Sequence, residues 1–371
     1  MSKKNFETLK DLPIPLPEPQ CVLHKDEILI CGGRCQSGCY SYNTYKDSYK
    51  FICDYPSNVK LDGHCVVNLV NNNSEGNDEI TLLSFGGLSK HTLIMKYVSV
   101  WSDNNNKNGI KRSKKLKKCN QWVPFTDNKE KVVKLGKQED RYEGARAVIG
   151  GGNDHLLFIT YQPKNISVFD LNTFQFIKHD TLPIDNEIYS PCFVSISENE
   201  QEMIRGNKKN KKNKKLLFHK KAGLLIKYDE TKNNFRYYVK KVCKDIAPFW
   251  NYGYVRINDI ILFFGGWSSK TGSKSVYKYS IPENKWMTFQ DALPTSLDGC
   301  VAMLSKDSEN VHVIGVLSAN CDSAITHLKT KKQLSVQEKN KKRKEREEEE
   351  EEREEEEEEA EEEEEVEEEV E

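Results

Sequence analysis

One local pattern recurs along this chain: a short apolar run that ends in two consecutive glycines. The clearest example runs from Ile260 to Phe264 and is followed by Gly265 and Gly266. The same pairing occurs at Gly32, Gly33, Gly86 and Gly87. Glycine accepts positive φ and leaves room for close backbone approach, so such a pair suits a tight corner between neighbouring strands. Several units of this kind at a period of about fifty residues would define the whole fold.

Each of the first five units continues in a similar way after its first two strand-like runs. A third run, a turn and a fourth run follow, and in four units an aromatic residue in the third run lies seven positions before one in the fourth. These pairs are Tyr42 and Tyr49, Phe169 and Phe176, Tyr228 and Phe235, and Tyr279 and Trp286. The pattern divides the chain into six units, at about residues 21–60, 61–126, 144–183, 190–246, 252–296 and 297–333. Short strands at even spacing, with glycine and aromatic residues marking each unit, are typical of a β-propeller.

The units resemble kelch repeats, in which a hydrophobic strand ends in Gly-Gly and is followed by a tyrosine and then, after a turn, by a tryptophan or another aromatic residue. Three units keep the glycine pair; in the other three the resemblance depends on the strands and the aromatic residues. The resemblance covers about residues 5–333 and implies an all-β, six-bladed kelch-type β-propeller with four strands, a to d, in each blade. It implies little about function, because propellers perform many unrelated roles.

The sixth unit contains three strand-like runs, one fewer than a complete blade. The N-terminal segment, residues 1–20, resembles the missing strand, since Phe6 lies seven positions before Pro13 as Phe176 lies seven before Pro183. We therefore expect about residues 5–12 to form the outer strand of the last blade. This strand would close the ring and remove an edge that favours aggregation. The alternative is a disordered N-terminus.

The net charge of −2 averages a basic body and an acidic tail. From Glu338 onward the chain has 23 acidic and 7 basic residues, and the preceding residues carry a net charge of +14. Like charges four positions apart repel one another on a helix, so residues 334–371 are predicted to be disordered or marginally helical. One hypothesis is that this charged C-terminal tail makes an intramolecular contact with basic groups of its own body.

Two long inserts are strongly basic. Their lysines include Lys114, Lys115, Lys117, Lys118, Lys208, Lys209, Lys211 and Lys212. In the expected propeller, the inserts join strand c to d and strand a to b, so both lie on one face. They indicate either solvated low-complexity loops, which we favour, or a basic face for an acidic protein, nucleic acid or membrane headgroups. Nucleic acid is not our first choice of partner, because aromatic residues that stack on single strands are absent from both inserts.

The chain shows no apolar segment typical of a secretory signal, and no stretch approaches the about 18 apolar residues of a transmembrane helix. The eleven cysteines are therefore expected to be reduced thiols. Cys31, Cys35 and Cys39 are spaced four apart, which fits no zinc framework, so we interpret them as ordinary thiols. A cytoplasmic protein is expected, although the lysine-rich runs also resemble nuclear localisation patches.

Some kelch-like propellers are enzymes, including copper radical oxidases, iron-dependent glucosinolate-modifying proteins and sugar epimerases. A copper or iron site needs converging histidine, tyrosine, cysteine or carboxylate ligands. His91 is expected in a b–c loop without a partner, and we predict no metal, no cofactor and no catalytic residue. Near the channel mouth or the face of the b–c loops we expect Arg34, Arg141, Arg146 and Trp250. Arg146 is expected to pair with a carboxylate in the propeller wall.

The sequence favours a non-catalytic interaction scaffold or adaptor that binds a protein partner through its inter-strand loops. Arginine and tryptophan commonly anchor interfaces. The candidate partner-binding residues, on the face of the b–c loops and d–a crossings, are Arg34, Lys90, Trp267, Ser268 and Lys270. Two alternatives stay open: a sugar-modifying or metal-dependent propeller enzyme, and a basic-loop binder of acidic partners or nucleic acid that the tail regulates. The identity of the partner is not predicted.

Overall fold

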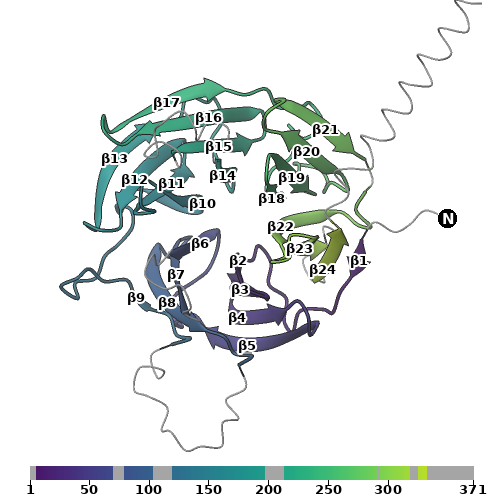
Figure 1. The fold of residues 1–371 in the computed structure, drawn as a ribbon, viewed down its shortest axis with the longest axis horizontal. Helices are drawn as coiled ribbons and strands as arrows, with labels where there is room; N and C mark the ends of the chain where they lie inside the picture. Colours follow the sequence, from purple (N-terminus) through teal and green to yellow (C-terminus); the bar gives the residue numbers. More distant parts are fainter. Residues whose placement is uncertain are drawn as a thin grey trace, which may run out of the picture.

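The computed structural model describes residues 6–69, 79–102, 119–196, 213–290, 292–317 and 325–331. These residues form six four-stranded antiparallel sheets, arranged radially like the blades of a propeller (Figure 1). The prediction of an all-β, six-bladed propeller is confirmed. Within the described ranges there is no helix that could cross a membrane. The eight lysines predicted in the basic inserts and the predicted tail lie outside the described residues.

Blades I to III take their strands in chain order. Blade I contains β2 (Cys21–His24), β3 (Glu27–Gly33), β4 (Gln36–Asn43) and β5 (Ser48–Asp54). Blade II contains β6 (His64–Leu69), β7 (Glu79–Gly86), β8 (His91–Val98) and β9 (Val123–Pro124). Blade III contains β10 (Arg141–Gly150), β11 (Leu156–Gln162), β12 (Asn165–Asp170) and β13 (Gln175–Thr181).

Blades IV and V follow the same order, whereas blade VI combines both ends of the described chain. Blade IV contains β14 (Cys192–Ile196), β15 (Lys214–His219), β16 (Ala222–Asp229) and β17 (Asn234–Val239). Blade V contains β18 (Gly253–Ile257), β19 (Ile260–Phe264), β20 (Val276–Ser280) and β21 (Lys285–Phe289). Blade VI contains β22 (Leu297–Leu304), β23 (Asn310–Leu317), β24 (Ile325–Lys331) and β1 (Glu7–Thr8). Strands β2, β6, β10, β14, β18 and β22 lie nearest the central axis (Figure 1).

The N-terminal strand closes the ring as predicted. β1 pairs antiparallel with β24, with Glu7 opposite Lys329 and Thr8 opposite Leu328. The strand is shorter than the eight residues expected. After one further backbone hydrogen bond, from Leu9 N to His327 O at 2.8 Å, the chain leaves the sheet. Leu12 then packs in the apolar cluster that joins blade VI to blade I, so this stretch fills a seam between blades and adds no further strand pairs.

The glycine pairs lie where one blade meets the inner strand of the next. Gly265 has a φ of +63°, and a Cβ placed on it would lie 2.6 Å from the backbone oxygen of Leu297 in blade VI. The amide of Gly266 donates to that same oxygen at 2.9 Å. Gly86 has a φ of +80°, and its Cβ would lie 2.9 Å from the oxygen of Tyr142 in blade III. These positions require glycine because any side chain would push adjacent blades apart.

The aromatic pairs seven residues apart lie opposite each other on the two outer strands of a blade. Ring centroids are 4.8 Å apart for Tyr42 and Tyr49 and 5.0 Å apart for Tyr279 and Trp286. The tyrosine hydroxyls also donate to the side chain five residues later, at Asp47, Asn233 and Asn284, each of which has positive φ. In blade III a phenylalanine replaces the tyrosine, and no such bond forms at residue 174. The repeat tyrosine therefore serves two purposes: it packs between strands and it stabilises the hairpin turn.

A buried lysine lies between blades III and IV. Lys215 is 0% exposed, and its Nζ lies 3.3 Å from the centroid of the Phe158 ring. Burial lowers the pKa of its ammonium to about 7, against a weaker opposing effect of Glu230. The unfolded chain, whose lysine pKa is about 10.4, therefore binds more protons above pH 7. The free energy of unfolding should rise with pH between about pH 7 and pH 10.

The Lys215→Met variant is expected to remove this dependence. Near neutral pH the variant should be more stable than the wild type, by up to about 4 kcal/mol. The reason is that a well-packed apolar side chain avoids the free-energy cost of burying or neutralising an ammonium group. Urea unfolding at pH 7, 8 and 9 measures both effects, and the half-buried neighbour Lys214 provides the matched control, Lys214→Met. A wild-type stability that stays level from pH 7 to pH 9 would contradict the expectation.

Candidate functional site

Six residues with positive φ surround one end of the central channel, at or just before the start of each inner strand. They are Glu18, Gly63, Gly144, Ser190, Asn251 and Gly299, with φ values between 47° and 71°. Backbone hydrogen bonds connect neighbouring members, from Gly144 N to Gly63 O at 2.7 Å, from Ser190 N to Gly144 O at 2.8 Å and from Gly299 N to Asn251 O at 3.1 Å. We call these six residues the mouth ring. Because d–a crossings lead into it, the mouth ring lies on the face of the b–c loops.

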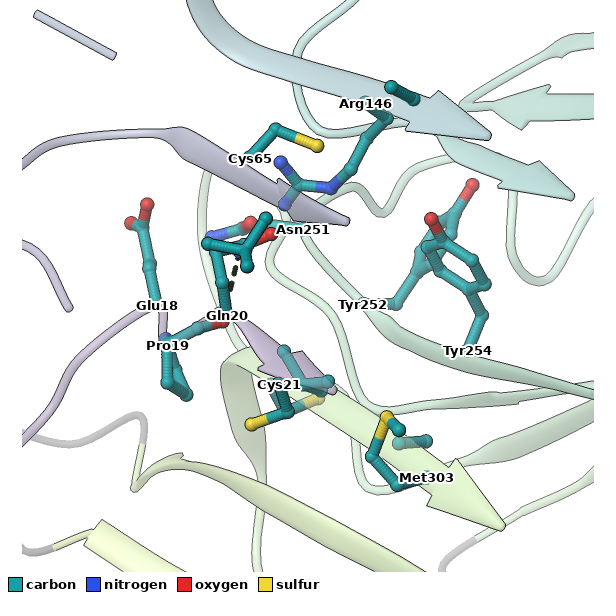
Figure 2. Close-up of a pocket in the computed structure, with 16 residues that line it drawn as sticks. Glu18, Pro19, Gln20, Cys21, Cys65, Arg146, Asn251, Tyr252, Tyr254 and Met303 are labelled. Atoms are coloured by element: carbon teal, nitrogen blue, oxygen red, sulfur yellow. Dashed lines mark hydrogen bonds between the residues drawn. The ribbon is translucent and has the colours of Figure 1, made fainter. Parts of the chain in front are cut away.

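A cavity of about 180 Å³ lies inside the mouth ring. Its polar lining includes Glu18, Gln20, Arg146, Asn251 and Tyr254. Four sulfur-bearing side chains also line it: Cys21, Cys65 and Met303, which Figure 2 labels, and Cys300. Met303 follows the mouth ring by four residues along β22.

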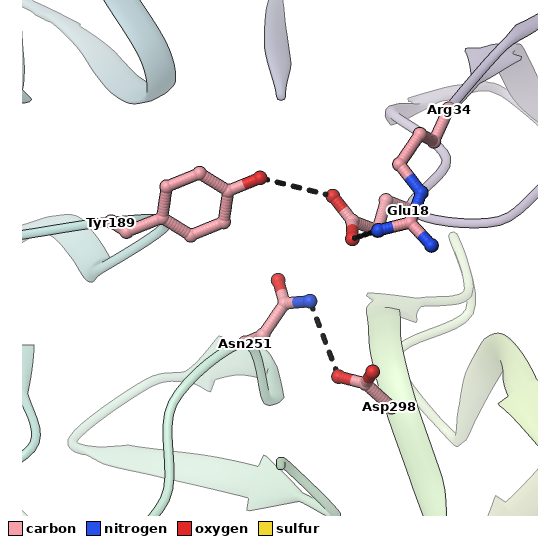
Figure 3. Close-up of polar contacts among 5 residues, drawn as sticks. All are labelled: Glu18, Arg34, Tyr189, Asn251 and Asp298. Carbon is pink, nitrogen blue, oxygen red and sulfur yellow. Dashed lines mark hydrogen bonds and ion pairs between the residues drawn. The ribbon is translucent and has the colours of Figure 1, made fainter. Parts of the chain in front are cut away.

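Glu18 is the member of the mouth ring that carries an acid. Its carboxylate accepts hydrogen bonds from Arg34 Nη1 at 3.3 Å and from the Tyr189 hydroxyl at 3.4 Å (Figure 3). Burial raises the pKa of the Glu18 carboxyl. The charge of Arg34 opposes this shift, while Asp298 and Asp62 add to it. Glu18 occupies a position with a φ of 53° where three other blades have glycine, so a side chain is held here at a cost in backbone strain.

A second carboxylate, that of Asp298 on β22 of blade VI, lies close to Glu18. Asp298 accepts a hydrogen bond from Asn251 Nδ2 at 3.2 Å (Figure 3). Burial raises the pKa of the Asp298 carboxyl, and the bonds from the Gly299 amide and Asn251 partly oppose this. At both carboxyls burial is the main cause of the raised pKa, because it disfavours the charged form.

Arg146 corrects one expectation from the sequence. It was expected to pair with a carboxylate in the propeller wall, but among the described residues it forms no salt bridge. Its Nη1 donates to the Ala145 carbonyl at 2.8 Å. The side chain reaches from β10 toward Cys65 and Asn251 in the cavity (Figure 2). Arg141, at the start of the same strand, instead forms an exposed ion pair with Glu187 at 3.5 Å.

The five candidate partner-binding residues do not form one site. Arg34, whose side chain is 54% exposed, contacts the cavity residue Glu18. Lys90 Nζ donates to the Gln138 carbonyl in the connection to blade III. Trp267 forms a backbone bridge with Trp250. In the same loop the Ser268 hydroxyl donates to the Thr271 carbonyl at 2.9 Å, and Lys270 is exposed.

The histidines and cysteines are mainly structural. His91 was expected in a loop without a partner; instead it begins β8, is 8% exposed and bonds through Nε2 to the Ser84 hydroxyl at 2.7 Å. Cys31 and Cys39 are buried opposite each other in blade I, and Cys35 is exposed in the turn between them. In the described ranges, no group of three His, Cys, Asp or Glu side chains is arranged to hold a metal ion.

The sequence identified Arg34 and Arg146 but missed Glu18, Tyr189, Asn251 and Asp298. Each missed residue lies in the crossing before an inner strand or at the start of that strand, within three residues of the mouth ring or in it. Aligning the units on the starts of their inner strands would have pointed to this position. The convergence of polar side chains from four blades depends on the closed ring and has no local sequence pattern.

Comparisons with known proteins give the fold. No protein-family model matches the chain, and no curated protein matches it. A solved propeller structure titled "Structure of YjhT" is similar with a TM-score of 0.54 and 13% sequence identity, covering 86% of this chain and 95% of that one. At this identity the similarity shows the architecture alone. The chain is thus a six-bladed β-propeller with a polar channel mouth.

Proposed function

We propose that the protein is a non-catalytic interaction scaffold of the kelch type, which binds a protein partner at the channel mouth. The observation that carries this proposal is the convergence of Glu18, Tyr189, Asn251 and Asp298, which come from four different parts of the ring and meet above a cavity (Figure 3). Exposed Arg34 borders them, and arginine is a frequent interface anchor. A cytoplasmic or nuclear partner is consistent with the proposal.

The test compares two ion pairs on opposite faces. The mouth pair is Arg34–Glu18, and the control pair is Lys306–Asp26, which joins two a–b turns at 3.9 Å. The doubly alanine-substituted proteins are used as bait in cell extract, and crosslinked partners are quantified by mass spectrometry. The mouth variant should lose a specific partner about tenfold or more, since interface anchors contribute 2 kcal/mol or more, whereas the control should retain it. Equal retention of the partner by both variants would show that the interface lies away from the mouth.

One observation favours a second candidate, an enzyme that acts on a small polar substrate such as a sugar. The Glu18 carboxyl has a raised pKa and contacts the Tyr189 hydroxyl, a pairing suited to proton transfer. Incubation with a panel of sugars, followed by NMR, tests it. Turnover that Glu18→Gln abolishes would favour the enzyme over the scaffold.

A basic-loop binder is the other candidate. The predicted basic inserts join β8 to β9 and β14 to β15. The strand ends that the inserts connect lie on the face opposite the mouth, because they are c–d and a–b ends. A partner that binds them would be retained by the mouth variant and lost when salt screens exposed charges.

A further inference from the structure

The guanidinium of Arg146 has hydrogen-bonding capacity that the protein does not use. Arginine carries five N–H donors in a planar fork. The one side-chain bond formed in the described part of the chain goes to the carbonyl of the preceding residue, Ala145, at 2.8 Å. The side chain is half-buried and lines the cavity (Figure 2). A charge withdrawn from water without a counterion is costly, so a ligand anion that restores the pairing would be stabilised.

Neighbouring carboxylates do not neutralise this charge. Glu18, the acid that lines the same cavity, is bonded to Arg34 and Tyr189 (Figure 3). Burial raises the pKa of Glu18, and among the nearby charges Arg34 opposes this shift more than Arg146 does. In the described part of the chain, Arg146 forms no ion pair with Glu18 or another carboxylate. Arg146 therefore faces the cavity with its positive charge largely uncompensated.

The remaining lining fits an acidic side chain. Gln20 and Asn251 border the guanidinium at the entrance, and their amides can bond to a carboxylate or to the backbone that carries it. Cys65, Cys300 and Met303 offer less polar surface against which the methylene groups of an inserted side chain can pack. A partly enclosed site strengthens a charge-assisted hydrogen bond relative to open water. The cavity of about 180 Å³ has room for one side chain of this size.

We propose that the partner inserts an aspartate or glutamate side chain into the cavity, where its carboxylate pairs with Arg146. This inference rests on the proposed function and names the chemistry of the partner. The planar fork of arginine matches a carboxylate in a bidentate arrangement. The chain's own acidic tail is a less suitable occupant. Lys331, the last described residue, pairs with Asn310 beside the a–b turn of blade VI, on the face opposite the mouth.

Three small probes test the assignment by NMR titration of the full-length protein. They are the N-acetyl methylamides of glutamate, glutamine and lysine. The glutamate probe should bind about tenfold or more tightly than the glutamine probe, because it alone offers a carboxylate. Inorganic phosphate is titrated separately. Phosphate binding as tight as that of the glutamate probe would show a general oxyanion site and would overturn the assignment to an acidic residue.

Two variants and one control variant test whether the glutamate probe binds at Arg146. Arg146→Met should abolish the preference for glutamate. Arg141→Met, on the same strand but in an exposed ion pair with Glu187, should leave it unchanged. Glu18→Gln should tighten binding of the glutamate probe, because it removes a competing negative charge. Melting temperatures of all three variants show whether each remains folded.

The outcomes separate this inference from the proposed function. Preferential binding of the lysine probe, weakened by Glu18→Gln and unaffected by Arg146→Met, would overturn the inference and leave docking at the mouth intact. Failure of every probe to bind would also overturn it. Probe binding as expected, combined with a crosslinked partner that the mouth variant and the control variant retain equally, would instead overturn the proposed function and leave a cavity for small carboxylates.

Discussion

Acidification from pH 7 to pH 4 is expected to unfold the propeller cooperatively. The buried histidines, with exposed fractions of 8% or less, include His64, His91, His219, His312 and His327. Burial lowers the pKa of His64, His219 and His312 to about 4 and that of His91 to about 3. Burial also lowers the pKa of His327, whose neighbour His312 adds to the effect. These rings enter the folded protein in their neutral form.

The direction of the pH effect follows from proton binding. Unfolded histidine has a pKa of about 6.5, so below this pH the unfolded chain binds protons that the folded protein excludes. Stability is therefore complete above about pH 6.5 and is lost as the pH falls toward 4. A difference of two or more pKa units corresponds to about 3 kcal/mol per residue. Five such residues together amount to about 15 kcal/mol, the upper end of the 5–15 kcal/mol that typically stabilises a protein.

The seam between blades VI and I is the most acid-sensitive location. His312 Nδ1 and His327 Nε2 lie 2.9 Å apart, and His327 Nδ1 bonds to the Tyr49 hydroxyl at 2.6 Å. Two protonated rings cannot share this hydrogen bond, because both nitrogens would carry hydrogen. Lys329 lies close enough to lower the pKa of both rings, while Asp307 opposes the shift at His312.

Circular dichroism and the free energy of unfolding in urea, measured from pH 7 to pH 4, check this prediction. The slope of that free energy against pH gives the number of protons taken up on unfolding, which should approach one for each of these five histidines. His312→Gln should lower the slope by about one proton. His179→Gln, which changes an exposed histidine, is the control. A protein that is still fully folded at pH 4 would contradict the expected neutral burial.

The fold was predictable because each blade is specified by local sequence. The turn after Tyr279 shows why: its ring packs on Trp286 while its hydroxyl bonds to Asn284. All three residues lie within one hairpin, so their spacing appears directly in the chain. Gly265 likewise marks the end of a strand, although the reason for glycine, the approach of Leu297, comes from the neighbouring blade.

The candidate site was only partly predictable, because its contacts join distant segments. Tyr189 and Glu18 are 171 positions apart in sequence, and Asn251 and Asp298 are 47 apart. No periodicity encodes such pairs. The environment of Arg146 was predicted wrongly for the same reason, since the groups that surround a channel residue are set by ring closure. His91 was misplaced because the connection after β7 holds only residues 87–90, so His91 is already the first residue of β8.

Deletion of residues 1–12 is expected to lower the melting temperature by about 10 °C or more. The deletion removes Phe6, which is 7% exposed and packs edge-on against Phe264 at 6.4 Å. It also removes both β1–β24 residue pairs and the Leu9–His327 backbone bond. β24 would then become an exposed edge, and exposed edges favour pairing with other chains. Light scattering should show self-association alongside the lower melting temperature measured by calorimetry.

Two point variants separate apolar packing from surface charge within this strand. Phe6→Ala should cost about 3–4 kcal/mol, because it leaves a cavity in the cluster shared by blades V and VI. Glu7→Ala removes an ion pair with Lys329 at 2.9 Å, in which the glutamate side chain is 61% exposed. Exposed pairs of this kind contribute at most about 1 kcal/mol, so this variant should melt close to the wild type.

The truncation also links the closing strand to acid sensitivity. Because Leu9 donates to the His327 carbonyl, loss of β1 should admit water to the seam that holds the His312–His327 pair. The shortened protein should therefore unfold at a higher pH than the full-length chain, in addition to melting earlier. A truncated protein that keeps its melting temperature, stays monomeric and unfolds at the same pH would show that packing between blades alone closes the ring, and that β1 contributes no stability to the propeller.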